Sequence, residues 1–119
     1  MTIDRQAIVG HDAIEAFWDF QEEAGRDRVS AEGLGYRLLE GSGRVERAEE
    51  GVFGPHAAKL AYGDWLYIPR PAIGGLDFHG SRSAMTMIAW LKREDRPNPR
   101  CEAVAGIWNE TEEKRQYCL

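Results

Sequence analysis

The sequence predicts an all-β fold, and three features carry this prediction. The run MTMIAWLK, residues 85–92, is apolar on both alternating faces, as expected of a strand that is covered on both sides. The run CEAVAGIW, residues 101–108, shows the same pattern, and its Gly106 allows another segment to pack closely. Loops rich in glycine, proline and charge separate the apolar runs, as in EGSGRVERAEEGVFG and REDRPNPR. We therefore expect short strands joined by solvated loops.

Length and composition predict one domain with a real core over residues 1–119. The chain has 119 residues, of which 43% are hydrophobic and 29% charged, without a low-complexity segment. Its net charge of -5 comes from 20 acidic and 15 basic residues that are interspersed, so we expect neither nucleic acid nor a membrane surface as a partner. The start, MTIDRQAIVG, lacks the features of a signal peptide, and cytoplasmic localisation is the default expectation.

Three shorter runs are also predicted to be strands. GYRLLE lies between glycine-bearing loops. Residues 57–62 and 65–68 flank the turn-forming pair Gly63 and Asp64, which predicts a hairpin that Pro69 and Pro71 end. The run 101–108 and the end of the chain, around Tyr117, form a second predicted hairpin across the charged turn NETEE.

The segment HDAIEAFWDFQEEAG is ambiguous. Ile14, Phe17 and Trp18 have helical spacing, and Gly25 suits a helix C-cap. The aromatic-rich AFWDF within it also fits a strand. The local pattern leaves both structures open.

The order of these runs resembles the first half of a laminin-G-like jelly-roll domain of the concanavalin A-like lectin and glucanase superfamily, and is most similar to bacterial members without an assigned function. The matching positions are Trp18, Asp19 and Phe20; Phe53, Gly54, Ala57 and Ala58; and Thr86, Ala89, Trp90 and Lys92. The resemblance implies an antiparallel two-sheet sandwich in which AFWDF is a strand. It also implies that the closing strands of a longer fold would follow Leu119. We therefore expect an incomplete sandwich with open apolar surface, which would self-associate or require its C-terminal half through open sheet edges.

The functional expectation comes from the same resemblance. The superfamily contains lectins, hydrolases and purely structural modules, so fold alone does not decide the function. We expect a non-catalytic recognition or accessory module with carbohydrate as its ligand class. The alternatives are a structural or protein-interaction sandwich without a sugar ligand, and a fragment of a glycoside hydrolase. Trp65, beside the Gly63-Asp64 turn with Tyr62 and Tyr67 nearby, is expected to be exposed and is the candidate ligand-binding group. Trp90 and Trp108 lie in apolar runs and are expected in the core.

The acidic cluster WNETEE does not predict an enzyme. Glu110 and Glu112 are two residues apart and share one face of a strand, as the carboxylates of laminarinase-type relatives do. The third position is Lys114, where such an enzyme needs an acid. A charged turn in solvent is the simpler interpretation, and we predict no catalytic residues and no hydrolysis of β-glucans.

No cofactor is predicted. His11, His56 and His79 are scattered without the spacing of metal ligands. Because many relatives of the resembled family bind calcium through loop oxygens, Asp19 and Asp77 are candidate ligands, but a single carboxylate is not a site.

The two cysteines are predicted to be reduced and buried. If Trp108 lies opposite Arg115, Cys118 lies opposite Ala105, and Cys101 would face a residue beyond Leu119. Bridged Cα atoms lie within about 7 Å of each other, so these two cysteines would not meet.

Overall fold

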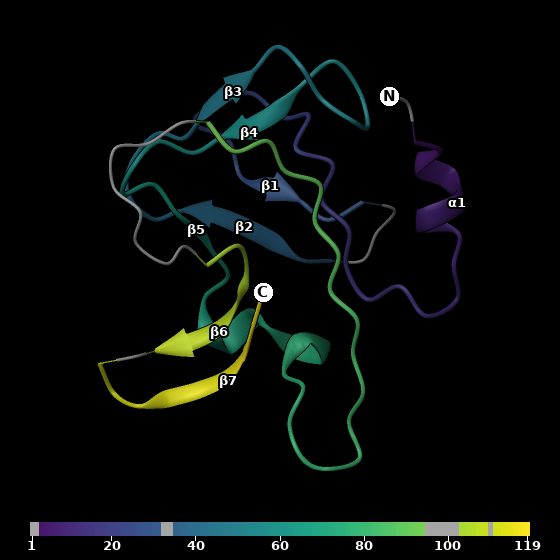
Figure 1. Cartoon of the computed structure of the whole chain (residues 1–119), viewed down its shortest axis with the longest axis vertical. Helices are drawn as coiled ribbons and strands as arrows, with labels where there is room; N and C mark the ends of the chain where they lie inside the picture. The colour runs from purple at the N-terminus through teal and green to yellow at the C-terminus, as the bar shows by residue number, and fades with distance from the viewer. Residues whose placement is uncertain (1–2, 32–34, 95–102, 110) are drawn as a thin grey trace. The chain divides into compact units, whose positions relative to one another are not determined.

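The computed structural model describes residues 3–31, 35–94, 103–109 and 111–119. This part of the chain contains one short α-helix, two 3-10 turns and seven strands, and every strand pair is antiparallel (Figure 1). The strands form three small sheets with the orders β1-β2-β5, β3-β4 and β6-β7. The chain divides into two compact units, Met1–Leu76 and Asp77–Leu119, which are described separately below. The predicted predominance of strands is confirmed.

The first unit holds two of the sheets. Its elements are α1 (Arg5–Val9), β1 (Arg28–Val29), β2 (Arg37–Glu40), β3 (Glu46–Ala48), β4 (Ala57–Lys59), β5 (Leu66–Tyr67), η1 (Arg70–Ala72) and η2 (Gly74–Leu76). The strand predicted in GYRLLE is confirmed as β2. It lies between β1 and β5.

The hairpin predicted around Gly63 and Asp64 is wrong. β4 pairs with β3, and β5 pairs with β2. The turn itself forms, because the Asp64 N–H donates to the Ala61 carbonyl over 3.0 Å. The Trp65 N–H then donates to Ser42 Oγ (3.1 Å), which directs the chain along β2 instead of back along β4.

The ambiguous segment is neither helix nor strand between residues 14 and 21, so the strand implied by the resemblance is not observed there. Phe17 is nevertheless buried, and its backbone is held at both ends: its N–H donates to Ser30 Oγ (3.1 Å) and its carbonyl accepts from the Ala31 N–H (2.8 Å). Phe20 has φ of 57°, a left-handed conformation that ends any regular run. The helix lies earlier, in α1, where the Asp4 side chain accepts from the Gln6 N–H and caps the first turn.

The core of the first unit is small and partly charged. Among its described residues Phe17, Ala31 and Val45 are the buried apolar ones, and the Phe17 ring meets that of Phe53 edge-on at 5.0 Å. Arg28 is 1% exposed, lies 3.5 Å from the Glu40 carboxylate, and donates to the Val45 carbonyl over 2.9 Å. Glu40 in turn accepts from the Val45 N–H. This network joins β1 and β2 to the loop that follows β2.

The second unit contains the predicted C-terminal hairpin, β6 (Gly106–Asn109) and β7 (Lys114–Cys118). The predicted opposition of Trp108 and Arg115 is confirmed. A bulge follows, so that Cys118 opposes Gly106 and not Ala105. Cys118 carries a free and exposed thiol, which corrects its predicted burial, and Cys101 lies outside the described residues.

The buried strand predicted at residues 85–92 is not observed. Residues 84–94 form no strand with any described part of the chain, and all but one of them are exposed. Trp90 and Trp108, expected in the core, are 42% and 51% exposed. A strand that is apolar on both faces is buried only if other elements cover both faces. The two-stranded sheet β6-β7, described in the second unit, is too small to cover both.

Candidate functional site

The predicted ligand-binding aromatics gather around the start of β5. Trp65 and Tyr67 are two residues apart, which places their side chains on the same side of an extended chain. Their ring centroids lie 5.0 Å apart with an interplanar angle of 41°. The two residues are 51% and 37% exposed, so the predicted exposure of Trp65 is confirmed. We call them the aromatic pair.

The indole of Trp65 is supported by the backbone of the loop after β2. A Cβ atom on Gly41 would lie 2.6 Å from Cε2 of the indole, so the ring occupies the space that a side chain would fill. The Gly41 N–H donates to the Trp65 carbonyl over 3.0 Å. Because both the ring and its backbone are held, the indole has a defined position although half of it faces solvent.

Two polar side chains complete this support. Ser42 Oγ accepts from the Trp65 N–H and donates to Asp64 Oδ1, with distances of 3.1 and 3.2 Å. The other carboxylate oxygen of Asp64 accepts from the Ala61 N–H (2.9 Å). Asp64 and Ser42 are hydrogen-bonding groups next to the exposed indole.

Tyr62 lies on the turn just before the aromatic pair. Gly63, the third residue of this turn, has φ of 86°, as a type II turn requires, and Tyr62 occupies the second position. Its side chain is 80% exposed. Among the described residues its ring contacts neither Trp65 nor Tyr67, so the structure brings together two of the three predicted aromatics.

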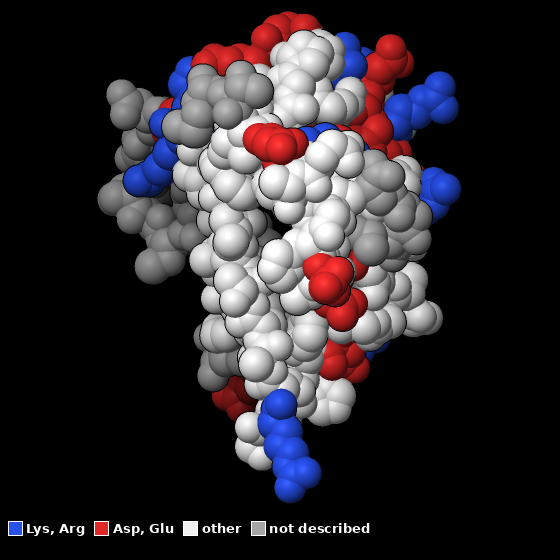
Figure 2. Space-filling view, turned by 90° about the vertical axis from the view of Figure 1, so that its right-hand side faces the viewer, with Lys and Arg blue, Asp and Glu red and all other residues white. Residues whose placement is uncertain are grey.

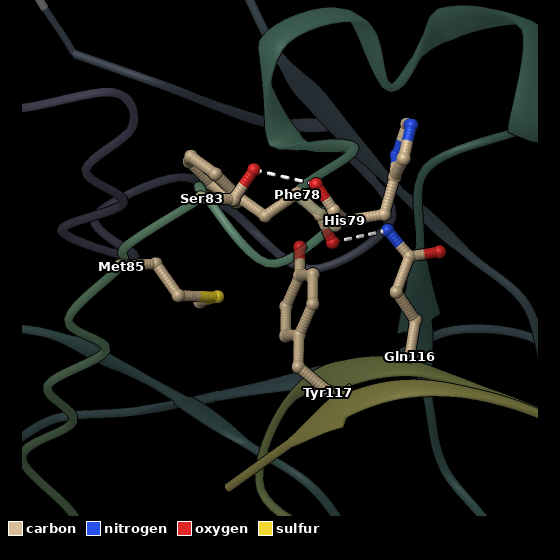
Figure 3. A pocket seen from close by; sticks show the side chains of 7 residues that line it. Phe78, His79, Ser83, Met85, Gln116 and Tyr117 are labelled. Atoms are coloured by element: carbon tan, nitrogen blue, oxygen red, sulfur yellow. Dashed lines mark hydrogen bonds between the residues drawn. The ribbon is translucent and has the colours of Figure 1, made fainter.

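A second candidate site is an open hollow of about 390 Å³ in Asp77–Leu119, which the sequence did not predict (Figure 3). It is lined by Phe78, His79, Gly80, Ser83, Met85, Gln116 and Tyr117. The Tyr117 side chain rises from β7 toward its centre. Burial, and next the negative charge of Asp77, raise the pKa of the Tyr117 phenol above 10.0.

The polar groups of this hollow bond mainly to the protein itself. Gln116, the additional residue of the β7 bulge, donates to Asp77 Oδ1 (2.7 Å) and to the Phe78 carbonyl (2.5 Å). The Ser83 hydroxyl donates to the His79 carbonyl and not to its imidazole, so it is not an activated nucleophile. His79 Nδ1 lies 3.1 Å from the Asp77 carbonyl oxygen and 3.5 Å from Asp77 Oδ1, so the imidazole too is directed at a neighbouring residue of the same segment.

The described residues of the acidic turn, Asn109 and 111–114, are exposed, as predicted. Glu112 bonds Asn109 through its N–H (3.1 Å) and lies 3.1 Å from Lys114 Nζ, and all three side chains are exposed. Glu110 lies outside the described residues. The described part of the turn thus has local ion pairing and no second carboxylate across a cleft.

The two candidate calcium ligands both have protein partners. Asp19 Oδ2 lies 2.9 Å from Arg5 Nε, and Asp77 accepts from Gln116. Among the described residues, no three His, Cys, Asp or Glu side chains are grouped as metal ligands would be.

Acidic and basic side chains both occur among the described residues on the face that Figure 2 shows, around a broad area without charged side chains. None of the described helices has the length and apolar character needed to cross a bilayer.

Of the sites described above, the aromatic pair beside Gly41 has the clearest binding chemistry. Comparisons of the chain with family models, with curated proteins and with solved structures find no match.

Proposed function

We propose that this chain is a non-catalytic recognition module that binds carbohydrate through Trp65, Tyr67 and Tyr62, and that its strands belong to a jelly-roll sandwich of the concanavalin A-like type. The observation that carries the proposal is the exposed indole of Trp65 held against Gly41. The flat, exposed indole can stack against the apolar face of a pyranose ring. Because the ring is already fixed, little conformational entropy is lost when a ligand binds.

The groups beside the ring indicate which sugars fit. The Ser42 hydroxyl donates its proton to Asp64 Oδ1, and Asp64 Oδ2 accepts from the Ala61 N–H. Each carboxylate oxygen can accept a second hydrogen bond, which a sugar hydroxyl could donate. A uronic acid or a sulfated sugar would place a second negative charge next to Asp64, so neutral glycans are the expected ligands.

A glycan array followed by calorimetric titration tests the proposal. Trp65→Ala should weaken binding of a neutral glycan at least about tenfold, because a lost stacking contact of this kind amounts to roughly 1.4 kcal/mol or more. Trp108→Ala is the matched control, since both tryptophans are 51% exposed and Trp108 lies in the other unit. An array without any bound glycan, or equal losses in the two variants, would refute the carbohydrate proposal.

A protein-interaction module without a sugar ligand is the second candidate. The observation in its favour is the exposure of large apolar side chains in Asp77–Leu119, among them Ile88 at 68% and Leu91 at 63%. Apolar side chains exposed this close together are typical of interaction surfaces. An empty glycan array combined with specific self-association would favour this function.

A further inference from the structure

Residues 82–94 of the second unit form an exposed and largely apolar segment. Figure 1 draws residues 84–94 as a long green trace without a helical turn. Met85, Ile88 and Leu91 are 38%, 68% and 63% exposed. Within the described part of the chain, residues 84–89 take part in no strand pairing. Residues 84–89 thus combine strand-forming side chains with a backbone that is unpaired within the described part of the chain.

We propose that this segment pairs with the same segment of a second copy, as an antiparallel ribbon whose two-fold axis passes through Ile88. The occupant is a second copy because the charges at the two ends of the segment complement each other. Arg82 lies six residues before Ile88 and Glu94 six residues after it. Each strand end of the pair would therefore bring Arg82 opposite the partner's Glu94.

Symmetry limits the registers that such a pair can adopt. Residues opposed in an antiparallel pair point to the same face of the ribbon. A two-fold axis that exchanges the strands stands perpendicular to the ribbon and leaves its faces unchanged. Two opposed residues must then differ in residue number by an even amount. The axis therefore lies at a residue that is paired with the same residue of the partner copy.

Charge then selects among the axis positions. With the axis at Met87, Arg82 would oppose the partner's Lys92, and with the axis at Ala89 it would oppose the partner's Arg96. Both registers place two pairs of like charges across the ribbon, which destabilises a strand pair. The axis at Ile88 replaces them with two pairs of opposite charge. Arg82 and Glu94 are both exposed, and neither forms an ion pair within the described residues.

The same register matches the apolar side chains. Ile88 opposes the partner's Ile88, and Met85 opposes the partner's Leu91. Thr86 opposes the partner's Trp90, a β-branched residue against an aromatic one, which is a favourable cross-strand pair. No apolar side chain of the segment is placed against a charge except Ala84, which faces the aliphatic stem of the partner's Lys92.

Disulfide trapping tests the axis. In a chain with Cys101→Ser and Cys118→Ser, the added change Ile88→Cys should give a cross-linked dimer under mild oxidation, because opposed Cα atoms lie about 4.5–5.5 Å apart. Leu91→Cys is the matched control: its exposure is 63% against 68% for Ile88. The two copies of residue 91 would be separated by about 20 Å along the ribbon, at roughly 3.3 Å per residue, and should not cross-link.

Charge reversal tests the register independently in the otherwise unchanged chain. Arg82→Glu and Glu94→Arg should each weaken the dimer about tenfold in sedimentation equilibrium, because each turns two attractive pairs into repulsive ones. The double variant should recover the original dissociation constant. A monomeric chain, cross-linking at residue 91 as efficient as at residue 88, or a double variant as weak as the single ones would overturn the proposal.

Discussion

The indole of Trp65 occupies the space where Gly41 would carry a side chain. We predict that Gly41→Ala displaces the ring and lowers the free energy of unfolding by about 1–3 kcal/mol, as overpacking commonly does. Urea unfolding and the tryptophan emission maximum measure the two effects. In a Trp65→Ala background the same change should be nearly neutral, and an equal loss there would place the cost in the backbone.

Tyr117 is the residue whose ionisation is predicted to affect stability. Because burial and Asp77 raise its folded-state pKa above 10.0, the unfolded chain loses the phenolic proton at lower pH than the folded chain. The stabilisation is complete below pH 10.0 and is lost as the pH rises through the folded-state pKa. The free energy of unfolding should therefore fall more steeply above pH 10.0 in the original chain than in Tyr117→Phe.

Phenolate absorbance gives a direct check of the cause. Asp77→Asn should lower the pKa of Tyr117 only in part, because burial is the larger contribution. An unchanged pKa in this variant would contradict the role of Asp77.

At the scale of the elements, the pair Arg28 and Glu40 joins β1 and β2. Arg28→Ala should lower the free energy of unfolding by about 3–5 kcal/mol, since it leaves the largely buried Glu40 carboxylate without its counter-charge. Arg37→Ala is the control on β2: its side chain is 63% exposed and 3.8 Å from Asp27, and its loss should cost less than about 1 kcal/mol. Similar denaturation midpoints for both variants would argue against a buried network.

The bulge in β7 attaches the hairpin to residues 77 and 78 through one side chain. Gln116→Ala should destabilise the second unit by about 1–3 kcal/mol, because two hydrogen bonds to Asp77 and Phe78 are lost. Gln116→Glu should destabilise the second unit further, since it places a second negative charge beside the Asp77 carboxylate. Lys114→Ala, on the same strand but exposed, should have little effect, and thermal unfolding of the three variants distinguishes these outcomes.

For the whole molecule, we predict that the two units differ in local stability. Of the residues that the structure describes, the buried apolar ones are Phe17, Ala31 and Val45, and all three belong to Met1–Leu76. Native-state hydrogen exchange should be slowest at backbone amides such as those of Ser30 and Ala31, which donate to Tyr36 and Phe17. It should be fast at residues 84–89, and equal protection in both units would contradict this prediction.

Local sequence patterns were sufficient for the features that depend on neighbouring residues. The glycine-bearing loops on either side of GYRLLE predicted β2, and the two runs around NETEE predicted the hairpin of β6 and β7 with Trp108 opposite Arg115. The solvated acidic turn and the exposure of Trp65 were also predictable, because each follows from residue types within a few positions. These features need no distant partner.

Features that depend on distant partners could not be predicted in this way. Gly63 and Asp64 make the expected turn, but the Ser42 hydroxyl, from a loop 23 residues away, decides that the next strand joins β2. The support of Trp65 by Gly41 and the bulge at Gln116 likewise depend on contacts that no local pattern contains.

The sequence by itself determined a chain rich in short strands, its C-terminal hairpin and an exposed tryptophan, because alternation, turn residues and charge act locally. Only the tertiary structure decided which strands pair, where Arg28 finds its counter-charge, and that residues 84–91 stay largely exposed. The physical reason is that an apolar residue is buried only if another part of the molecule covers it, and that cover is a property of the assembled layers.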